Sequence, residues 1–202
     1  GDTTFFGIYF NSGDQLSVTS WATEFRRTTT VYRDPAAWMH IVVAVDMDQV
    51  TPTDRIRLYV NGVQPALSVI ANPTQSTVLG ASASSTVHYL SSYGAGTNSY
   101  NGYMSDVYFV DGQQLTPLSF GQFSTNNVWQ PKLYNGSYGN NGFHLQFNNA
   151  NILGQDSSTN SFNFSTSTSI STISQVIDTP NNNFATGNPL QPSSGTLTSG
   201  NL

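Results

Sequence analysis

The carboxylates are the first residues to consider, because two of them at the correct spacing would hydrolyse a glycosidic bond. A retaining glycosidase holds a general acid and a nucleophile about 5 Å apart. Glu24 is the only glutamate among the 202 residues. The nearest pair at strand spacing, Asp46 and Asp48, lies just before Pro52, where solvated turn residues are the commoner interpretation. The sequence therefore contains no hydrolase motif.

Histidine and cysteine chemistry is also disfavoured. His40, His88 and His144 are far apart, and none has a second histidine or a nearby carboxylate at the spacing of a metal site. His40 follows Trp38 on an alternating segment, so we expect a packed, hydrogen-bonded core residue. There is no Gly-x-Ser-x-Gly elbow and no cysteine, which excludes disulfides and thiolate sites. We therefore expect no catalytic residue and no enzymatic activity.

Calcium is the more serious metal hypothesis. Asp46, Asp48 and Asp54 surround one loop and have the hard oxygen ligands that calcium prefers. The loop lacks the dense acidic series of a dedicated site, and the same residues suit a turn between two strands. We therefore expect no metal and no cofactor, with these three residues as weak calcium candidates.

The segment 88–100 is a better functional candidate, because it combines tyrosines, amides and hydroxyls with glycines. Proteins recognise sugars with aromatic faces that cover C–H patches and with amides that pair with hydroxyls. The candidate glycan ligands are Tyr93, which would stack on a sugar ring, Asn98, which would pair with its hydroxyls, and Tyr100. The alternative is that Tyr89 and Tyr100 are strand-end residues packed on a sheet edge.

Composition favours β-structure and excludes two classes of partner. Only 8% of the residues are charged, 37% are hydrophobic and 12% are aromatic. The net charge is −5 and the six basic residues are scattered, so no basic stripe is available for nucleic acid. No window approaches the roughly 18 apolar residues of a membrane span, so we expect no membrane insertion.

Period-two patterns predict an antiparallel β-protein with little helix. We expect strands at 5–10, 15–18, 41–45, 55–60, 103–110, 143–147 and 170–177, and a short turn at 117–121. The branched run 41–45 suggests a central strand covered on both sides. In 55–60, Ile56, Leu58 and Val60 share one face, while the arginines and Tyr59 point away.

Four Asn-Gly steps add turn signals to these strands. The first, Asn61-Gly62, directly follows the strand at 55–60. Because a type I′ turn needs positive φ at both central residues, this step predicts a hairpin.

Two runs carry a family resemblance. Trp38-Met39-His40 opens a run to Asp46, and Tyr59-Val60-Asn61-Gly62 closes the next strand. Together they resemble the laminin-G-like, concanavalin A-like jelly-roll family. Residues 100–115 are similar to its late strand, although Ser105 stands where the first acid of a pair is usual. The resemblance implies an all-β antiparallel jelly-roll sandwich over residues 1–153, with a loop-rich, Asn/Ser/Thr-rich extension or linker at 154–202.

Further blocks at 129–143, 153–158 and 178–190 are similar to domains in structural proteins of tailed bacteriophages. This resemblance implies a module of a virion appendage (a tail fibre, head fibre or decoration) that is assembled in the host cytoplasm. It also implies a homo-oligomer, preferentially a trimer, with other virion proteins and host-surface polysaccharide as partners. A secreted bacterial lectin is the alternative, and a polysaccharide depolymerase is a distant third. Relatives have strands before this start and continue beyond this end, so we expect a segment of a longer fibre.

Overall fold

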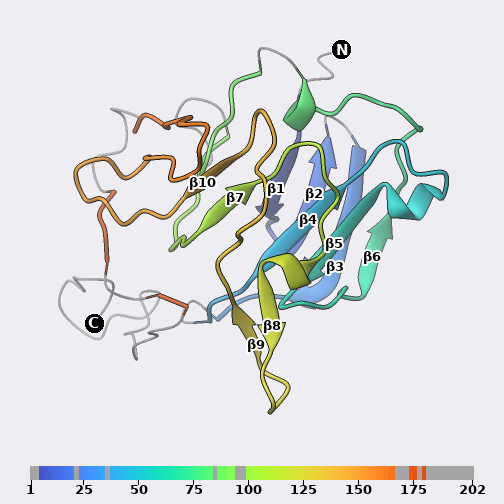
Figure 1. Cartoon of the computed structure of the whole chain (residues 1–202). Helices are drawn as coiled ribbons and strands as arrows, with labels where there is room; N and C mark the ends of the chain where they lie inside the picture. Colours follow the sequence, from blue (N-terminus) through green and yellow to red (C-terminus); the bar gives the residue numbers. More distant parts are fainter. Residues whose placement is uncertain are drawn as a thin grey trace. The chain divides into compact units, whose positions relative to one another are not determined.

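In the part of the chain that the computed structural model describes, regular secondary structure is antiparallel β-structure with three single 3₁₀ turns (Figure 1). The strands are β1 (Gly7–Phe10), β2 (Gln15–Ser20), β3 (Thr23–Val31), β4 (Ile41–Val45), β5 (Ile56–Val60), β6 (Leu67–Ile70), β7 (Val107–Phe109), β8 (Gly121–Phe123), β9 (Trp129–Pro131) and β10 (Phe143–Leu145). The turns are η1 (Pro52–Asp54), η2 (Gly80–Ser82) and η3 (Pro117–Ser119). The all-β prediction is confirmed, and so is the short turn near 117. None of the helical turns in this described part has the length to cross a membrane.

The structure describes residues 5–20, 23–34, 37–83, 86–93, 99–166, 173–176 and 179–180. The chain divides into two compact units. Unit 1 comprises Gly1–Asp34, Met39–His88 and Gln114–Tyr134, and unit 2 comprises Pro35–Trp38, Tyr89–Gln113 and Asn135–Leu202. The domain division expected at residue 153 stays a prediction.

Unit 1 contains a four-stranded sheet of order β1-β2-β3-β6 and the pairs β4-β5 and β8-β9. As predicted, the first two strands are antiparallel neighbours, with Phe10 opposite Leu16 and Gly7 opposite Thr19. The pair β8-β9 was not expected from the sequence, because its strands are only three residues long and have no clear alternation.

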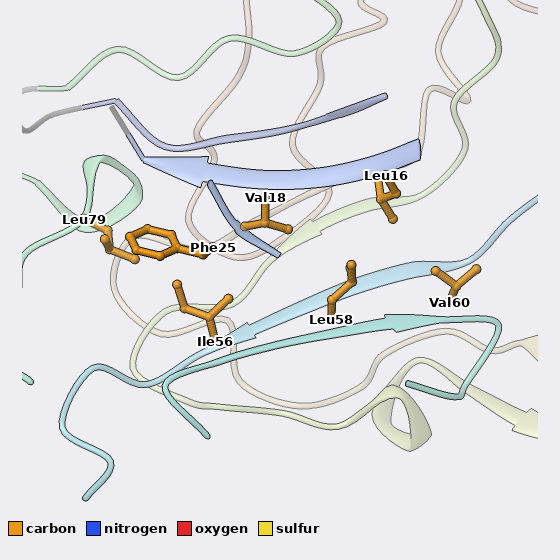
Figure 2. Close-up of a cluster of buried hydrophobic side chains, with 7 residues drawn as sticks. All are labelled: Leu16, Val18, Phe25, Ile56, Leu58, Val60 and Leu79. Atoms are coloured by element: carbon orange, nitrogen blue, oxygen red, sulfur yellow. The ribbon is translucent and has the colours of Figure 1, made fainter. Parts of the chain in front are cut away.

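The core of unit 1 lies between β2 and β3 on one side and β5 on the other (Figure 2). Its buried members are Leu16, Val18, Phe25, Ile56, Leu58, Val60 and Leu79. The predicted apolar face of β5 is confirmed, since Ile56, Leu58 and Val60 are all buried. Each such side chain contributes about 1.5–3 kcal/mol when it is removed from water. This two-layer packing is the sandwich that the patterns predicted.

One expectation for a neighbouring strand is wrong. The strand β4 is not covered on both sides, since within the described residues it pairs only with β5 and only its Ala44 is buried. An antiparallel sandwich strand needs only one covered face, so a branched run does not imply a central position. Arg55, just before β5, is buried, and its guanidinium donates to the carbonyls of Gln49, Val50 and Pro73.

The turn at Asn61-Gly62 has the predicted backbone, with φ of 49° and 82°. A side chain at Gly62 would also collide with the ring of Trp129. The expected hairpin is nevertheless wrong beyond a Val60–Val63 bridge, because β6 leaves to pair with β3. The glycines of the other three Asn-Gly steps do not have positive φ. An Asn-Gly step alone therefore does not determine which strand the residues after the turn pair with.

In unit 2, β7 pairs with β10, with Phe109 opposite Phe143. Both strands are shorter than predicted, because Asp106 and Phe147 have positive φ values of 51° and 55° that interrupt extended backbone. Of the strand expected at 170–177, residues 173–176 are not in a strand, and the rest lies outside the described residues.

Arg26 is the most extensively bonded side chain of unit 1. It is 2% exposed, and its guanidinium donates to five oxygens. The acceptors are the carbonyls of Ile56 at 2.9 Å, Phe25 at 2.7 Å, Ala71 at 2.6 Å and Thr53 at 3.2 Å, and Oδ1 of Asn72 at 3.2 Å. Burial lowers the pKa of Arg26, but an arginine stays charged in proteins. Arg26 therefore ties β3 to β5 and to two loops.

We predict that Arg26→Met lowers the free energy of unfolding by about 3 kcal/mol or more, because several buried carbonyls lose their donors. Urea denaturation measures this change. The control is Arg33→Met, because Arg33 pairs with Asp14 at 2.7 Å on the surface and is 72% exposed. Its loss should change stability by no more than about 0.5 kcal/mol. Equal effects of the two substitutions would refute the role given to Arg26.

Candidate functional site

The predicted glycan loop exposes its tyrosines. Tyr93 is 53% exposed, Tyr89 48% and Tyr100 42%. The base of the loop is closed by a hydrogen bond of 2.7 Å from the backbone N–H of Tyr100 to the carbonyl of Ser91. Asn98, the predicted hydroxyl partner, lies outside the described residues. The structure thus shows Tyr93 and Tyr100 as exposed residues of a segment in which Ser91 and Tyr100 are joined by a backbone hydrogen bond.

Tyr100 also has a packing role. Its ring lies over Gly102, where an added Cβ would be only 2.5 Å from the ring carbon Cζ. Desolvation of the ring raises the pKa of Tyr100. The packing alternative therefore applies in part to Tyr100, and Tyr93 is the more accessible candidate.

A second aromatic group in unit 2 surrounds a histidine. The ring of His144 stacks on Tyr108 with centroids 4.1 Å apart, and Tyr138 lies parallel at 6.2 Å. His144 is 2% exposed, and its Nε2 is 3.0 Å from Oδ1 of Asp106. Spacing along the sequence did not reveal this contact of His144 with a carboxylate. The two residues are 38 positions apart, and the pairing of β7 with β10 brings them together.

This His–Asp pair does not have the order of a catalytic triad. In a triad the histidine lies between the nucleophile and the carboxylate. Here the hydroxyl of Ser105 donates to Oδ2 of Asp106 at 3.1 Å, so the carboxylate lies between the serine and His144. The arrangement orients the histidine ring but does not activate Ser105 as a nucleophile.

Asp156 fixes the loop that follows β10. It is 7% exposed, and its carboxylate accepts four hydrogen bonds of 2.8 Å. The donors are the backbone N–H groups of His144, Ser158 and Phe162 and the hydroxyl of Ser158. Burial alone would raise the pKa of Asp156, but these bonds outweigh it and the pKa is lowered. Asp156 is therefore an anionic anchor for residues 156–162.

The three weak calcium candidates, Asp46, Asp48 and Asp54, instead have partners in and around one turn. Asp46 accepts from the N–H of Asp48 at 3.0 Å and from Nε2 of Gln49 at 2.7 Å. Asp48 accepts from the hydroxyl of Ser76, and Asp54 pairs with an arginine, Arg57, at 3.0 Å. Within the described ranges no group of three or more His, Cys, Asp or Glu is arranged to hold a metal ion.

His40 is packed, as predicted. The hydrogen bond that was expected for its ring is missing at Nδ1 among the described residues. It is half-buried against Trp129, with ring centroids 5.5 Å apart. In the described part of the chain its buried Nδ1 has no hydrogen-bond partner. Burial lowers the pKa of His40, so the neutral ring is favoured in this contact. No pattern in the sequence indicated this pair, because the strand that carries Trp129 was not predicted.

An open hollow of about 250 Å³ lies between residues 151–154 and 164–166 of unit 2. Its lining combines Asn151, Ile152 and Phe164 with two hydroxyl residues. It is smaller than the roughly 300–1,000 Å³ of ordinary ligand pockets. The accessible tyrosines therefore remain the stronger candidate in unit 2.

A family model described as Concanavalin A-like lectin/glucanases superfamily matches residues 1–119. The matched span includes β1 to β7 and the whole four-stranded sheet. Neither a search of curated proteins nor a search of solved structures found a match.

We predict that Asp156→Asn lowers the free energy of unfolding by about 2–3 kcal/mol, because the amide loses the charge and faces donors with its own N–H groups. The folded pKa is lowered, so the contribution is present above the unfolded pKa and is lost as pH falls through the folded pKa. Chemical denaturation should therefore show that the difference from wild type shrinks in acid.

The control for this prediction is Asp111→Asn. Asp111 accepts from the backbone and side chain of Asn141 at 3.2 and 2.8 Å near the surface. Its substitution should cost less than about 1 kcal/mol. A pH-independent difference for Asp156→Asn would contradict the anchoring role of the carboxylate.

Proposed function

Because the chain belongs to the concanavalin A-like lectin/glucanases superfamily, we propose that it is a non-catalytic carbohydrate-binding module of a bacteriophage virion appendage. The observation that carries the binding role is the exposure of Tyr93 on a loop with a hydrogen-bonded base. A ring held at the surface offers a flat apolar face to sugar C–H groups. Single contacts of this kind are worth about 1 kcal/mol, so one site binds in the millimolar range.

The engagement of the carboxylates supports binding over hydrolysis. A glucanase needs two carboxyl groups that flank the scissile bond. Glu24 is ion-paired with Arg27, and Asp106 is bound to His144. Asp156 is buried and saturated with donors. Each of these carboxylates thus has a partner other than a second carboxylate, which favours a lectin-like module over a depolymerase.

The appendage role is supported by the sequence blocks at 129–143, 153–158 and 178–190, which are similar to those of phage structural proteins. A trimer suits this role, because several copies raise the avidity of weak sugar contacts. A secreted lectin would share the binding chemistry but would be absent from virions.

We predict that Tyr93→Ala abolishes binding to an array of bacterial surface polysaccharides while the melting temperature stays unchanged, because the removed ring is exposed. Glycan-array fluorescence and thermal unfolding measure the two effects. The control is Tyr89→Ala, a similarly exposed tyrosine on the same segment, which should keep its binding. Unfolding of Tyr93→Ala would show that the ring is structural. Unchanged binding would place recognition elsewhere.

The appendage proposal predicts that peptides from residues 56–132 are found by mass spectrometry in purified virions. It also predicts that light scattering at micromolar concentration gives the mass of three chains. Peptides found only in the culture supernatant of an uninfected bacterium would favour the secreted lectin. A monomer mass would contradict the trimer.

A further inference from the structure

The chain contains four Asn-Gly steps, and only one of them forms the turn that these residues favour. They are Asn61-Gly62, Asn101-Gly102, Asn135-Gly136 and Asn141-Gly142. Only the first has positive φ at both residues. An Asn-Gly step also has a chemical property. Because glycine has no Cβ, its backbone nitrogen can approach and attack the side-chain amide of the asparagine before it. How tightly the fold holds each step decides whether this attack can occur.

The step at Asn61-Gly62 is held on both sides. Oδ1 of Asn61 accepts from the backbone N–H of His40 at 2.9 Å, and the backbone N–H of Asn61 donates to the carbonyl of His40 at 2.8 Å. The ring of Trp129 lies against Gly62. Rotation of the Asn61 side chain toward the nitrogen of Gly62 would break the bond at Oδ1, so this step is protected.

The step at Asn141-Gly142 is held more tightly. The backbone N–H and Nδ2 of Asn141 both donate to Oδ2 of Asp111, at 3.2 and 2.8 Å. Gly142 is buried, and its carbonyl accepts from Nδ2 of Asn160 at 2.8 Å. The negative charge of Asp111 also opposes deprotonation of the attacking nitrogen of Gly142. This step is therefore protected by contacts and by charge.

The step at Asn101-Gly102 is restrained in part. Both residues are exposed and make no hydrogen bond with any described residue. The residue before them is fixed, because the backbone N–H of Tyr100 donates to the carbonyl of Ser91 at 2.7 Å. The ring of Tyr100 lies over Gly102. This ring hinders the approach to the nitrogen of Gly102.

The step at Asn135-Gly136 has the least restraint of the four. Both residues are exposed and outside the strands, and in the described part of the chain neither makes a hydrogen bond through backbone or side chain. The residues on either side are anchored. Tyr134 is buried with its ring centroid 5.0 Å from that of Phe120, and the carbonyl of Ser137 accepts from a glutamine side chain at 3.0 Å. An unrestrained Asn-Gly step thus lies between two fixed residues.

We propose that Asn135 is a site of spontaneous deamidation, at which the folded protein acquires aspartate and isoaspartate. The backbone nitrogen of Gly136 loses its proton and attacks Cγ of Asn135. The new C–N bond closes a cyclic imide, and Nδ2 takes up a proton and leaves as ammonia. Water then adds to one of the two imide carbonyls and breaks its bond to nitrogen. Cleavage at Cγ gives aspartate, and cleavage at the main-chain carbonyl gives isoaspartate.

The modification changes both charge and backbone at this position. Either product places a new carboxylate at residue 135 of a chain whose net charge is already −5. Isoaspartate also routes the main chain through the former side chain, which adds a methylene carbon where the segment Asn135–Leu202 of unit 2 begins. The inference goes beyond the proposed function and uses none of the candidate glycan ligands.

The test is incubation of the purified, folded chain in H₂¹⁸O at neutral pH and in mild alkali, followed by peptic digestion in acid and mass spectrometry. The ¹⁸O label marks each carboxylate that forms during the incubation. Asn135 should convert fastest, and its rate should rise with pH because the attacking nitrogen must be deprotonated. Asn101 should be slower. Asn61 and Asn141 should convert at least about tenfold more slowly than Asn135, because their hydrogen bonds must break first.

Two controls separate the effect of the fold from that of the dipeptide. The same incubation in concentrated urea should remove the differences, because the reacting residues are identical in all four steps. Asp111→Ala releases the backbone and side chain of Asn141 and should raise conversion there about tenfold, without a change at Asn135. Thermal unfolding shows whether this variant is folded, and the comparison of wild type with and without urea decides the case if it is not.

Fastest labelling at Asn135 in the folded chain, with similar rates at the four steps in urea, supports the proposal. It is overturned if Asn135 stays unlabelled in the folded chain or converts no faster than the other three asparagines. The same ranking in urea also overturns it, because the neighbouring sequence and not the fold would then set the rates. Unchanged conversion of Asn141 in folded Asp111→Ala contradicts the protection on which the ranking depends.

Discussion

A buried charge must have its hydrogen-bonding groups satisfied, and this requirement organises both units of the chain. Arg26 meets it with four carbonyls and one amide oxygen, and in doing so joins β3 to β5 and the loops around Thr53 and Ala71. Asp156 meets it with backbone and hydroxyl donors after β10. In a chain without cysteine, these contacts hold loops where disulfides otherwise could.

The same constraint shapes the surfaces available for function. Apolar residues of β2 fill the core of unit 1, and at the surface of β3 Glu24 and Arg27 neutralise each other in an ion pair. In unit 2, the backbone bond between Tyr100 and Ser91 closes a loop that leaves Tyr93 accessible. The segment around Tyr93 and Tyr100 presents aromatic rings rather than paired acids, and this chemistry suits binding better than hydrolysis.

The alternation of apolar and polar residues and the turn residues predicted those features that depend only on neighbours in the sequence. The buried face of β5 and the positive φ at Asn61-Gly62 followed directly from residue type and alternation. The sequence did not predict where β6 pairs, because that choice depends on long-range contacts with β3. It also missed the His144–Asp106 contact, since strand pairing brings together residues that are distant in the chain. Of the predicted site, Tyr93 and Tyr100 are exposed, Asn98 is outside the described residues, and the role of all three as glycan ligands stays a prediction.

The central claim is that the chain binds polysaccharide without cleaving it. The most direct measurement is size-exclusion chromatography with light scattering of a bacterial surface polysaccharide, after prolonged incubation with the purified chain. We expect protein and polysaccharide to elute together and the polysaccharide to keep its length. Shortened polysaccharide would show an enzyme, and separate elution of intact polysaccharide and protein would contradict binding.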